Sequence, residues 1–285
     1  MNPQKIAILV DSGTDVPQDF IAQNGLYMVP LTVIYQDREY KDKVEISPQE
    51  VYDRLEQEVP RTSLPSPELI NSAFEQMIQD GYEHVLVITI SSGLSGTNNL
   101  MRLAAQGFPQ LDIHIVDTKN IGFGAGTQAL LAVSQIQEGK TFREVCDAVE
   151  HSARNSHIYF CLSTLEYLAK GGRIGKVAAA VGTLLNLKPI ITCNEEGAYV
   201  TASKVRGRAQ SIAETIRVAT EEAARHLRVR IGVVQGSAME EGRRVLEEMK
   251  RLVKNCEHFV FTDVSPALVV HTGPGLLGIS VQALP

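Results

Sequence analysis

The feature that most constrains the fold of this chain is the regular alternation of short apolar segments with longer amphipathic ones through its first half. Four apolar segments have the length and composition of strands: residues 5–10, 27–35, 84–90 and 111–117. The segments between them have helical patterns, and Pro17 and Gly81 mark a helix start and a helix end. Because apolar strands that alternate with helices are typical of a parallel sheet covered on both faces, we expect an α/β fold.

The second half of the chain has a different pattern, in which some strands follow one another directly. A strand at 157–162 precedes a mainly helical stretch at 165–186, which is broken at Gly171–Gly172. A hairpin follows around Glu196–Gly197, and the remaining sequence combines two long helices with further strands. We therefore expect a smaller α+β domain.

Length and charge limit what the protein is and what it binds. The 285 residues suit two domains, and the change of pattern divides them into residues 1–155 and 156–285. A net charge of −6 argues against a nucleic-acid partner, which needs a basic face. The four cysteines are scattered without CxxC spacing, so we expect no metal, disulfide framework or cofactor. No apolar run reaches the length of a membrane span or a secretion signal, and we expect a cytoplasmic protein.

Hydroxyl side chains are concentrated directly after the apolar segment 84–90. The stretch "SSGLSGT", residues 91–97, holds four hydroxyls and two glycines in seven positions. The stretches "DSGTD" and "DTKN" follow two other predicted strands in the same way. In open α/β sheets, ligands bind beyond the carboxyl ends of the strands. We therefore expect a binding site where these polar stretches meet.

Three short motifs and one histidine could belong to a functional site or have a purely structural role. "GLSGT" resembles the GxSxG motif of serine hydrolases, but its second glycine comes one residue early, and a capped turn that binds an anion fits equally. "GPGLLG" matches GxGxxG but precedes a strand, which argues against a dinucleotide site. His271 is either a core histidine or a polar group in a crevice. In "TSLPS", Ser66 fits a helix cap, whereas Thr62 and Ser63 have no such explanation.

Six motifs occur in a specific order along the chain: "RTSLPSP", "SSGLSGT", "LEYLAKGGRIG", "LNLKPI", "KVRGR" and "HTGPGLLG". Together they resemble the DegV family of bacterial fatty-acid-binding proteins, the acyl carriers of fatty acid kinase. The resemblance implies an N-terminal α/β/α domain with a parallel four-stranded sheet and a C-terminal two-layer α/β domain with a mixed sheet. It also implies one long-chain, hexadecanoate-like fatty acid between the domains, with its tail in an apolar tunnel and its carboxylate near the surface.

The resemblance also implies a set of residues that binds the carboxylate, in which Thr62 and Ser95 make direct contacts. The other members of this set are Gly96, through its amide, His271, Ser63 and Ser92. Small hydroxyls suit this role because they donate hydrogen bonds to a carboxylate without adding a fixed charge. The same donors would also suit an acyl phosphate.

The apolar tail of such a ligand needs a dry slot. The segment 178–185, "AAAVGTLL", has the small and apolar residues for this lining, although ordinary helix packing explains it equally well. Asn98 stands where the family often has an aromatic residue, and Thr118 stands where it usually has a serine. These two departures leave the preferred chain length and unsaturation open.

Basic residues gather in two short segments of this acidic chain. "KGGR" contains Lys170 and Arg173, and "SKVRGR" contains Lys204, Arg206 and Arg208. We expect Arg173, Lys204 and Arg206 to contact the kinase or phosphate groups, because the planar arginine fork suits phosphate oxygens. A solvated edge is the alternative.

The function expected from these observations is that of a carrier without catalytic activity of its own. It would bind a fatty acid, present the carboxylate to a separate fatty acid kinase and hold the acyl-phosphate product. Transient contact with a membrane is consistent with such a ligand. An enzyme is the rival class, either a lipid hydrolase that uses Ser95 or a kinase of the dihydroxyacetone type.

Overall fold

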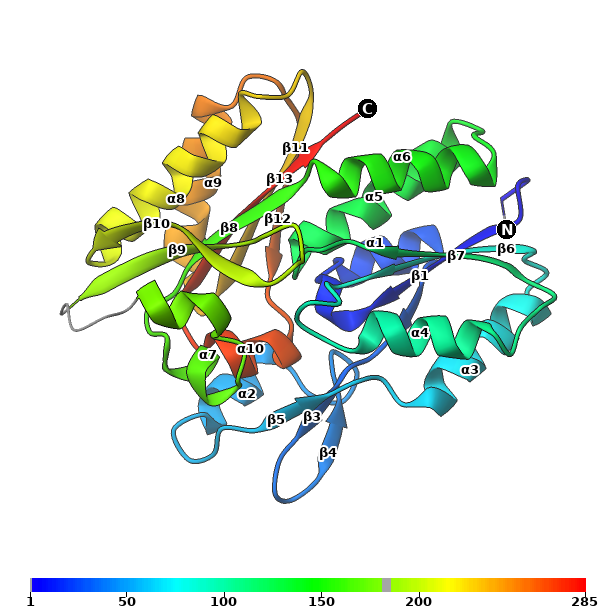
Figure 1. Cartoon of the computed structure of the whole chain (residues 1–285), viewed down its shortest axis with the longest axis horizontal. Coiled ribbons are helices and arrows are strands. Elements are labelled where there is room, and N and C mark those ends of the chain that lie inside the picture. The colour runs from blue at the N-terminus through cyan, green and yellow to red at the C-terminus, as the bar shows by residue number, and fades with distance from the viewer. Residues whose placement is uncertain (1, 181–185) are drawn as a thin grey trace.

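The computed structural model describes residues 2–180 and 186–285 of the chain. Its first sheet has four parallel strands in the order β2-β1-β6-β7 (Figure 1). The strands are β1 (Ile6–Asp11), β2 (Tyr27–Val29), β6 (His84–Thr89) and β7 (Asp112–Asp117). This arrangement confirms the parallel four-stranded sheet that the sequence pattern predicts.

Helices cover both faces of the parallel sheet because the side chains of its strands alternate between two apolar cores. In β1, Ala7 and Leu9 pack with Phe74 and Met77 on one face. That face is covered by α3 (Pro67–Gln79) and α4 (Thr97–Ala105), and the opposite face by α1 (Gln18–Asn24), α5 (Phe123–Gln137) and α6 (Phe142–Arg154) (Figure 1). Helix α6 is not among the predicted elements.

The segment 27–35, predicted as one strand, is two strands in two different sheets, so that prediction is wrong. Strand β2 ends at Val29, and β3 (Thr32–Ile34) pairs antiparallel with β4 (Glu39–Lys41) and β5 (Arg61–Ser63). Pro30 lies between them, and its missing N–H and fixed φ favour an interruption of the ladder. The short helix α2 (Pro48–Arg54) connects β4 to β5 and has a capping box of Ser47 and Glu50.

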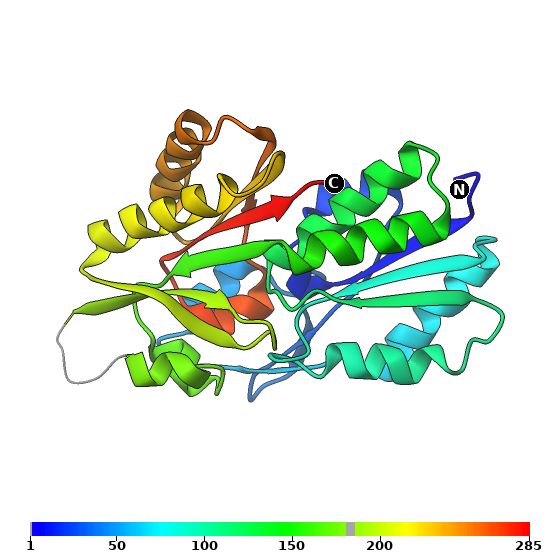
Figure 2. The same cartoon turned by 45° about the horizontal axis from the view of Figure 1, so that its top comes forward.

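The second half forms a six-stranded mixed sheet in the order β10-β9-β8-β13-β11-β12. Its strands are β8 (His157–Cys161), β9 (Leu187–Cys193), β10 (Tyr199–Arg206), β11 (Val229–Gly236), β12 (Cys256–Asp263) and β13 (Leu276–Ala283). Only the β11–β12 pair is parallel among the described pairings. Helices α8 (Arg208–Ala223) and α9 (Met239–Leu252) cover one face (Figure 2). The predicted mixed sheet and the hairpin near Gly197 are confirmed.

Three short helical elements surround the inner face of the mixed sheet: α7 (Glu166–Lys170), the 3₁₀ helix η2 (Gly175–Ala180) and α10 (Pro266–Thr272). The predicted break at Gly171–Gly172 is present, since α7 ends just before it and Gly172 has a φ of +72°. The segment 178–185, expected to line the tail slot, cannot be placed there, because residues 181–185 lie outside the described residues.

Helix α5 connects the two halves of the molecule. It packs against β1 and β6 of the parallel sheet and against β8, β11 and β13 of the mixed sheet. Twelve of its 15 residues are buried, as expected for a helix with protein on all sides. The expected domain boundary at residue 155 falls in the connection between α6 and β8.

No helix within residues 2–180 and 186–285 is both long and apolar enough to cross a membrane. The same residues contain no group of three or more His, Cys, Asp or Glu side chains arranged to hold a metal ion.

Candidate ligand-binding site

A cavity of about 220 Å³ lies between the parallel sheet and the mixed sheet. A single water needs only about 10–15 Å³, so this space is large enough for a ligand of many atoms. Segments at the carboxyl ends of β1 and β6 line one side, and β8, β10, β11, α10 and β13 line the other. The cavity therefore lies where the polar strand ends predict a binding site.

Most of the cavity wall is apolar. Aliphatic and aromatic side chains from both halves of the chain contribute to it: Leu31, Leu64, Ile90, Leu94, Ile121, Phe123, Ile158, Phe160, Val234, Val264, Ala267, Leu268 and Leu276. Many of these side chains belong to one continuous buried cluster. Such a wall offers dispersion contacts and no hydrogen bonds, and it suits a hydrocarbon chain.

A polar group at one side of the cavity is centred on Thr62 and His271. Thr62 Oγ1 lies 2.8 Å from His271 Nε2, although the two residues are 209 positions apart. Strand β5 holds Thr62 in place, because Thr62 pairs with Val33 of β3. Helix α10 carries His271, and its first turn donates the Ala267 N–H to Asp42 Oδ1 at 2.9 Å.

His271 is neutral at neutral pH, because desolvation of its ring and the nearby charge of Arg173 lower its pKa to about 4. Its Nδ1 is buried without a partner among the described residues, and it lies so close to Gly171 that a Cβ there would be 2.0 Å away. We assign the ring hydrogen to Nε2, because the other tautomer would bury an N–H without an acceptor. His271 then donates to Thr62 Oγ1, and the Thr62 hydroxyl hydrogen is free to donate to a ligand.

Three other predicted site residues, Ser63, Ser95 and Arg173, also line the cavity. Ser63 and Arg173 are exposed, so the polar side of the cavity reaches the protein surface. Ser95 Oγ lies 2.9 Å from Thr97 Oγ1 and accepts the Thr97 N–H, which closes a short turn directly before α4. Its hydroxyl thus belongs both to the start of α4 and to the cavity wall.

Gly96 lies directly behind this wall rather than in it. A Cβ at Gly96 would be 3.4 Å from Cδ1 of Leu64, which lines the cavity. Gly96 is also the residue that precedes the first turn of α4. Gly96 is thus next to a residue of the cavity wall, Ser95, but does not itself line the cavity.

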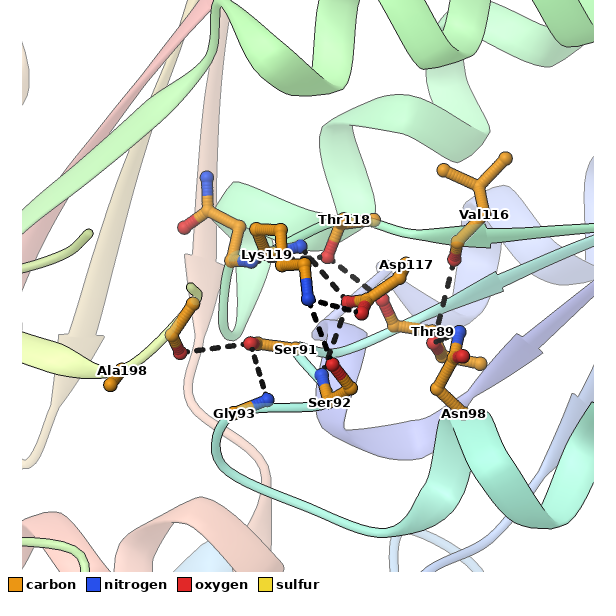
Figure 3. A network of polar contacts seen from close by, with 12 residues as sticks. Thr89, Ser91, Ser92, Gly93, Asn98, Val116, Asp117, Thr118, Lys119 and Ala198 are labelled. Atoms are coloured by element: carbon orange, nitrogen blue, oxygen red, sulfur yellow. Dashed lines mark hydrogen bonds and ion pairs between the residues drawn. The ribbon is translucent and has the colours of Figure 1, made fainter. Parts of the chain in front are cut away.

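Ser91 and Ser92, from the same polar stretch as Ser95, take part in a hydrogen-bond network outside the cavity (Figure 3). The Ser91 hydroxyl is buried and donates to the Gly197 carbonyl at 2.8 Å, which ties this loop to the β9–β10 turn. Ser92 Oγ accepts a hydrogen bond of 2.9 Å from Lys119 Nζ, and its N–H donates to Asp117. The structure therefore separates Ser92 from the other predicted site residues.

The two departures from the family pattern belong to the same network, and neither lines the cavity. Asn98 Nδ2 donates to Thr89 Oγ1 at 2.9 Å (Figure 3). Thr118 Oγ1 donates to the Thr89 carbonyl at 2.8 Å. Asn98 therefore ties α4 to the carboxyl end of β6, and Thr118, which follows β7, ties the ends of β6 and β7 together.

The basic residues expected to contact a kinase are not all in one place. Arg173 lines the cavity, and its Nη1 donates to the Gly171 carbonyl at 2.7 Å. Lys204 and Arg206 are exposed on β10 and do not line it. Arg208 is in an ion pair of 2.7 Å with Glu241.

Three polar residues of the cavity wall are not among the predicted site residues: Asp15, Tyr199 and Thr272. All three are buried, and Asp15 and Tyr199 have exposed fractions of 1% and 6%. The position of Asp15 in "DSGTD", after the first strand, is a signal that could have identified it. Tyr199 begins a strand of the hairpin, and no pattern in its neighbourhood distinguishes it from a core tyrosine.

Three carboxyl groups near the cavity are buried, Asp11, Asp15 and Asp42, and two of them, Asp15 and Asp42, accept backbone N–H groups at the start of α10. Asp15 Oδ1 accepts the Ser265 N–H at 2.9 Å, just before the helix begins. Burial raises the pKa of Asp11 to about 7 and that of Asp15 to about 6, and it also raises the pKa of Asp42. Lys43 Nζ, 3.6 Å from Asp15 Oδ1, lowers the pKa of Asp15 and so offsets part of this effect.

Comparison with known proteins places this geometry in a family. The family model described as "Uncharacterised protein, DegV family" matches residues 5–284. A DegV domain-containing protein of Clostridium acetobutylicum is 40% identical over 281 residues, which cover 98% of this chain and 99% of the relative.

Two solved structures have the same fold. One is described as fatty acid binding of a DegV family protein from Thermus thermophilus, with a TM-score of 0.92, 32% identity and coverage of 100% of both chains. The other is a stearic-acid-binding protein from Eubacterium ventriosum, with a TM-score of 0.90, 26% identity and coverage of 98% of both chains. These matches confirm the predicted DegV-like fold. Since the family model and the relatives cover nearly the whole chain, the protein belongs to the DegV family.

Proposed function

We propose that this protein binds one long-chain fatty acid, with its tail in the apolar cavity and its carboxylate beside Thr62 and His271. The observation that carries the proposal is the division of one cavity into a long apolar wall and a small neutral hydrogen-bonding group that reaches the surface. The similar proteins described as fatty-acid-binding, from Thermus thermophilus and Eubacterium ventriosum, support the same ligand class. A hexadecanoate-like acid is the ligand expected.

The two parts of the cavity have different energetic roles. Burial is worth roughly 0.8 kcal/mol per methylene, so a sixteen-carbon tail gains on the order of 10 kcal/mol before ordering costs. A hydrogen bond to a charged carboxylate adds only about 1.5–3 kcal/mol. The tail therefore supplies most of the affinity, and the hydroxyls of Thr62 and Ser95, with Arg173, supply the orientation and the preference for an acid.

Affinities for hexadecanoate and its methyl ester test the carboxylate assignment. Thr62→Val and Ser95→Ala each remove one donor with little change of shape. Each variant is expected to weaken binding of the acid by about one to two powers of ten, from the energy of a charged hydrogen bond. Binding of the ester should change much less, because the ester has no anionic acceptor. Since both residues act on one head group, the double variant should depart from additivity.

Two matched controls come from the same chain. Ser92→Ala removes a hydroxyl of the same loop that lies outside the cavity, and Thr201→Val removes a buried hydroxyl without a partner in residues 2–180 and 186–285. Neither control should change the ratio of acid to ester affinity. Equal losses for acid and ester in Thr62→Val and Ser95→Ala would mean that these hydroxyls hold the fold and do not bind the carboxylate.

We further infer that the protein is a carrier that presents the bound acid to a separate fatty acid kinase and holds the acyl-phosphate product. The exposed side chain of Arg173 at the cavity supports this role, because arginine suits phosphate oxygens. Arg206 is exposed on β10 and is proposed to face the kinase. Arg206→Ala should keep fatty-acid binding and slow phosphorylation in a reconstituted assay. Unchanged phosphorylation across a salt series would contradict this role.

An enzyme remains the alternative class, and one contact weighs against it. Ser95 Oγ bonds to Thr97, whereas His271 bonds to Thr62, so the serine and the histidine do not form a nucleophile–base pair. Extraction and mass spectrometry of the purified protein separate the classes. A stoichiometric fatty acid supports the carrier. An empty protein that hydrolyses esters would support a Ser95 hydrolase, and one that phosphorylates small ketoses would support a kinase of the dihydroxyacetone type.

A further inference from the structure

The largely apolar part of the cavity wall contains one buried carboxylate. Asp15 is 1% exposed and lines the cavity. Its Oδ1 accepts the Ser265 N–H and lies 3.6 Å from Lys43 Nζ. Its Oδ2 is buried and makes no full hydrogen bond within the described parts of the chain, although the Ser265 side chain is near enough to lower the Asp15 pKa. A buried carboxylate oxygen without a partner is costly, and that cost calls for an explanation.

The neighbour of this oxygen also belongs to the cavity wall. Gly122 lines the cavity, and a Cβ at that position would be 2.9 Å from Asp15 Oδ2, so a larger residue there would crowd the oxygen. Gly122 has a φ of +54°, a conformation that favours glycine. Tyr199 lines the same cavity, and the charge of Asp15 contributes, after burial and Cys193, to the raised Tyr199 pKa.

Helix α10 separates this polar group from the carboxylate site. Asp15 binds Ser265, which directly precedes the helix, and His271 is in its last turn. Six residues separate Ser265 from His271, which corresponds to about 9 Å along a helix axis. A ligand whose carboxylate lies at His271 therefore passes Asp15 several carbons along its chain.

We propose that Asp15 and Tyr199 form a second polar site in the cavity, which recognises a hydroxyl group on the fatty-acid chain several carbons from the carboxylate. The inference rests on the proposed fatty-acid function and names a substrate class within it. The ligand hydroxyl donates to Asp15 Oδ2, and the Tyr199 hydroxyl is placed to complete the hydrogen bonding. Unsubstituted and hydroxylated fatty acids would make the same contacts at the carboxylate site. They would differ only in the contacts with Asp15 and Tyr199.

The test measures dissociation constants for hexadecanoate and for monohydroxyhexadecanoates substituted at successive positions along the chain. At least one mid-chain isomer should bind about ten- to a hundredfold more tightly than hexadecanoate, from one hydrogen bond to a charged acceptor. The 2-hydroxy isomer should show no such preference, because its hydroxyl lies beside the carboxylate. Asp15→Asn should reduce the mid-chain preference by about tenfold, since the amide makes only a neutral hydrogen bond. Tyr199→Phe should also reduce it.

Controls separate this site from the fold. Asp42→Asn changes the other aspartate that holds α10, but Asp42 does not line the cavity, so the preference should persist. Tyr82→Phe is the matched change at a tyrosine outside the cavity. If hexadecanoate binds and no mid-chain isomer is preferred, the second polar site is refuted while the proposed function stands. In that case the buried Ser265 hydroxyl satisfies Asp15 instead. If no fatty acid binds, both proposals fail.

Discussion

Replacement of Asp11 by asparagine should stabilise the protein, and the gain should depend on pH. Asp11 is fully buried at the end of β1, where its Oδ2 accepts the Ile90 N–H at 2.9 Å. Its Oδ1 makes no full hydrogen bond among the described residues, although the nearby Gly13 N–H lowers the pKa of the carboxyl. Burial, with smaller contributions from the charges of Asp42 and Asp15, raises its pKa from 3.8 to about 7. The folded state therefore carries a carboxylate that it disfavours at neutral pH.

The size of the gain follows from this shift. At 1.36 kcal/mol per pKa unit, a rise of about three units means that ionised Asp11 lowers the free energy of unfolding by about 4 kcal/mol. Asparagine keeps an acceptor for the Ile90 N–H, but it buries an amide N–H without a partner at a cost of about 1–3 kcal/mol. Asp11→Asn should then raise the free energy of unfolding by about 1–3 kcal/mol at pH values above about 8.

The sign of the pH dependence is fixed because the folded pKa lies above the unfolded one. Between pH 3.8 and about 7 the folded state binds more protons than the unfolded state, so the stability of the wild type falls as the pH rises through this window. The asparagine variant lacks this contribution. The advantage of the variant should therefore shrink as the pH falls below about 7 and reverse before pH 4, where the variant should be the less stable protein.

Urea unfolding of both proteins at several pH values measures this difference. Asp53→Asn is the matched control, because Asp53 is exposed on α2 and its change should stay within about 0.5 kcal/mol at every pH. A destabilised Asp11→Asn at high pH, or a difference that does not vary with pH, would refute the reasoning. Either result would mean that the Asp11 carboxylate is compensated by a partner in solution.

The remaining predictions concern the contacts that hold the cavity together. Ser91→Ala removes the buried bond to the Gly197 carbonyl and should lower the free energy of unfolding by about 1–3 kcal/mol, measured by urea unfolding. Gly126→Ala in α5 should destabilise the protein, because the added Cβ would lie 2.2 Å from the Thr14 carbonyl oxygen. This clash should outweigh the helix-propensity gain of about 1 kcal/mol, and an unchanged melting temperature would contradict the prediction. The NMR titration of His271 should have its midpoint near pH 4, and a midpoint near 6.5 would show that the ring is solvated.

Local patterns in the sequence were sufficient to predict most of the parallel sheet and the general place of the site. The apolar segments at 5–10, 84–90 and 111–117 predict parallel strands because burial on both faces requires continuous apolar runs. The polar stretches after these strands predict where a ligand binds, since the carboxyl ends of parallel strands share one edge. Both inferences depend only on neighbouring residues, so they do not need knowledge of the tertiary structure.

The same local patterns could not show which hydroxyl groups line the cavity and which make structural hydrogen bonds. Ser91, Ser92 and Ser95 belong to one short stretch, yet only Ser95 lines the cavity, while the other two bond to Gly197 and Lys119. The partners come from segments far away in the sequence, and the direction of each side chain depends on the loop conformation. The split of segment 27–35 between two sheets has the same origin, because only the second sheet gives β3 its pairing partners.

The pairing of Thr62 with His271 and the position of Asp15 in the cavity wall were decided by the tertiary structure alone. These contacts join segments separated by 209 and 250 residues through hydrogen bonds to α10. A sequence pattern of short range carries no information about such distances. The residue types, small hydroxyls and buried acids, are fixed by the sequence, but their chemistry depends on the desolvation and the partners that only the packed fold provides.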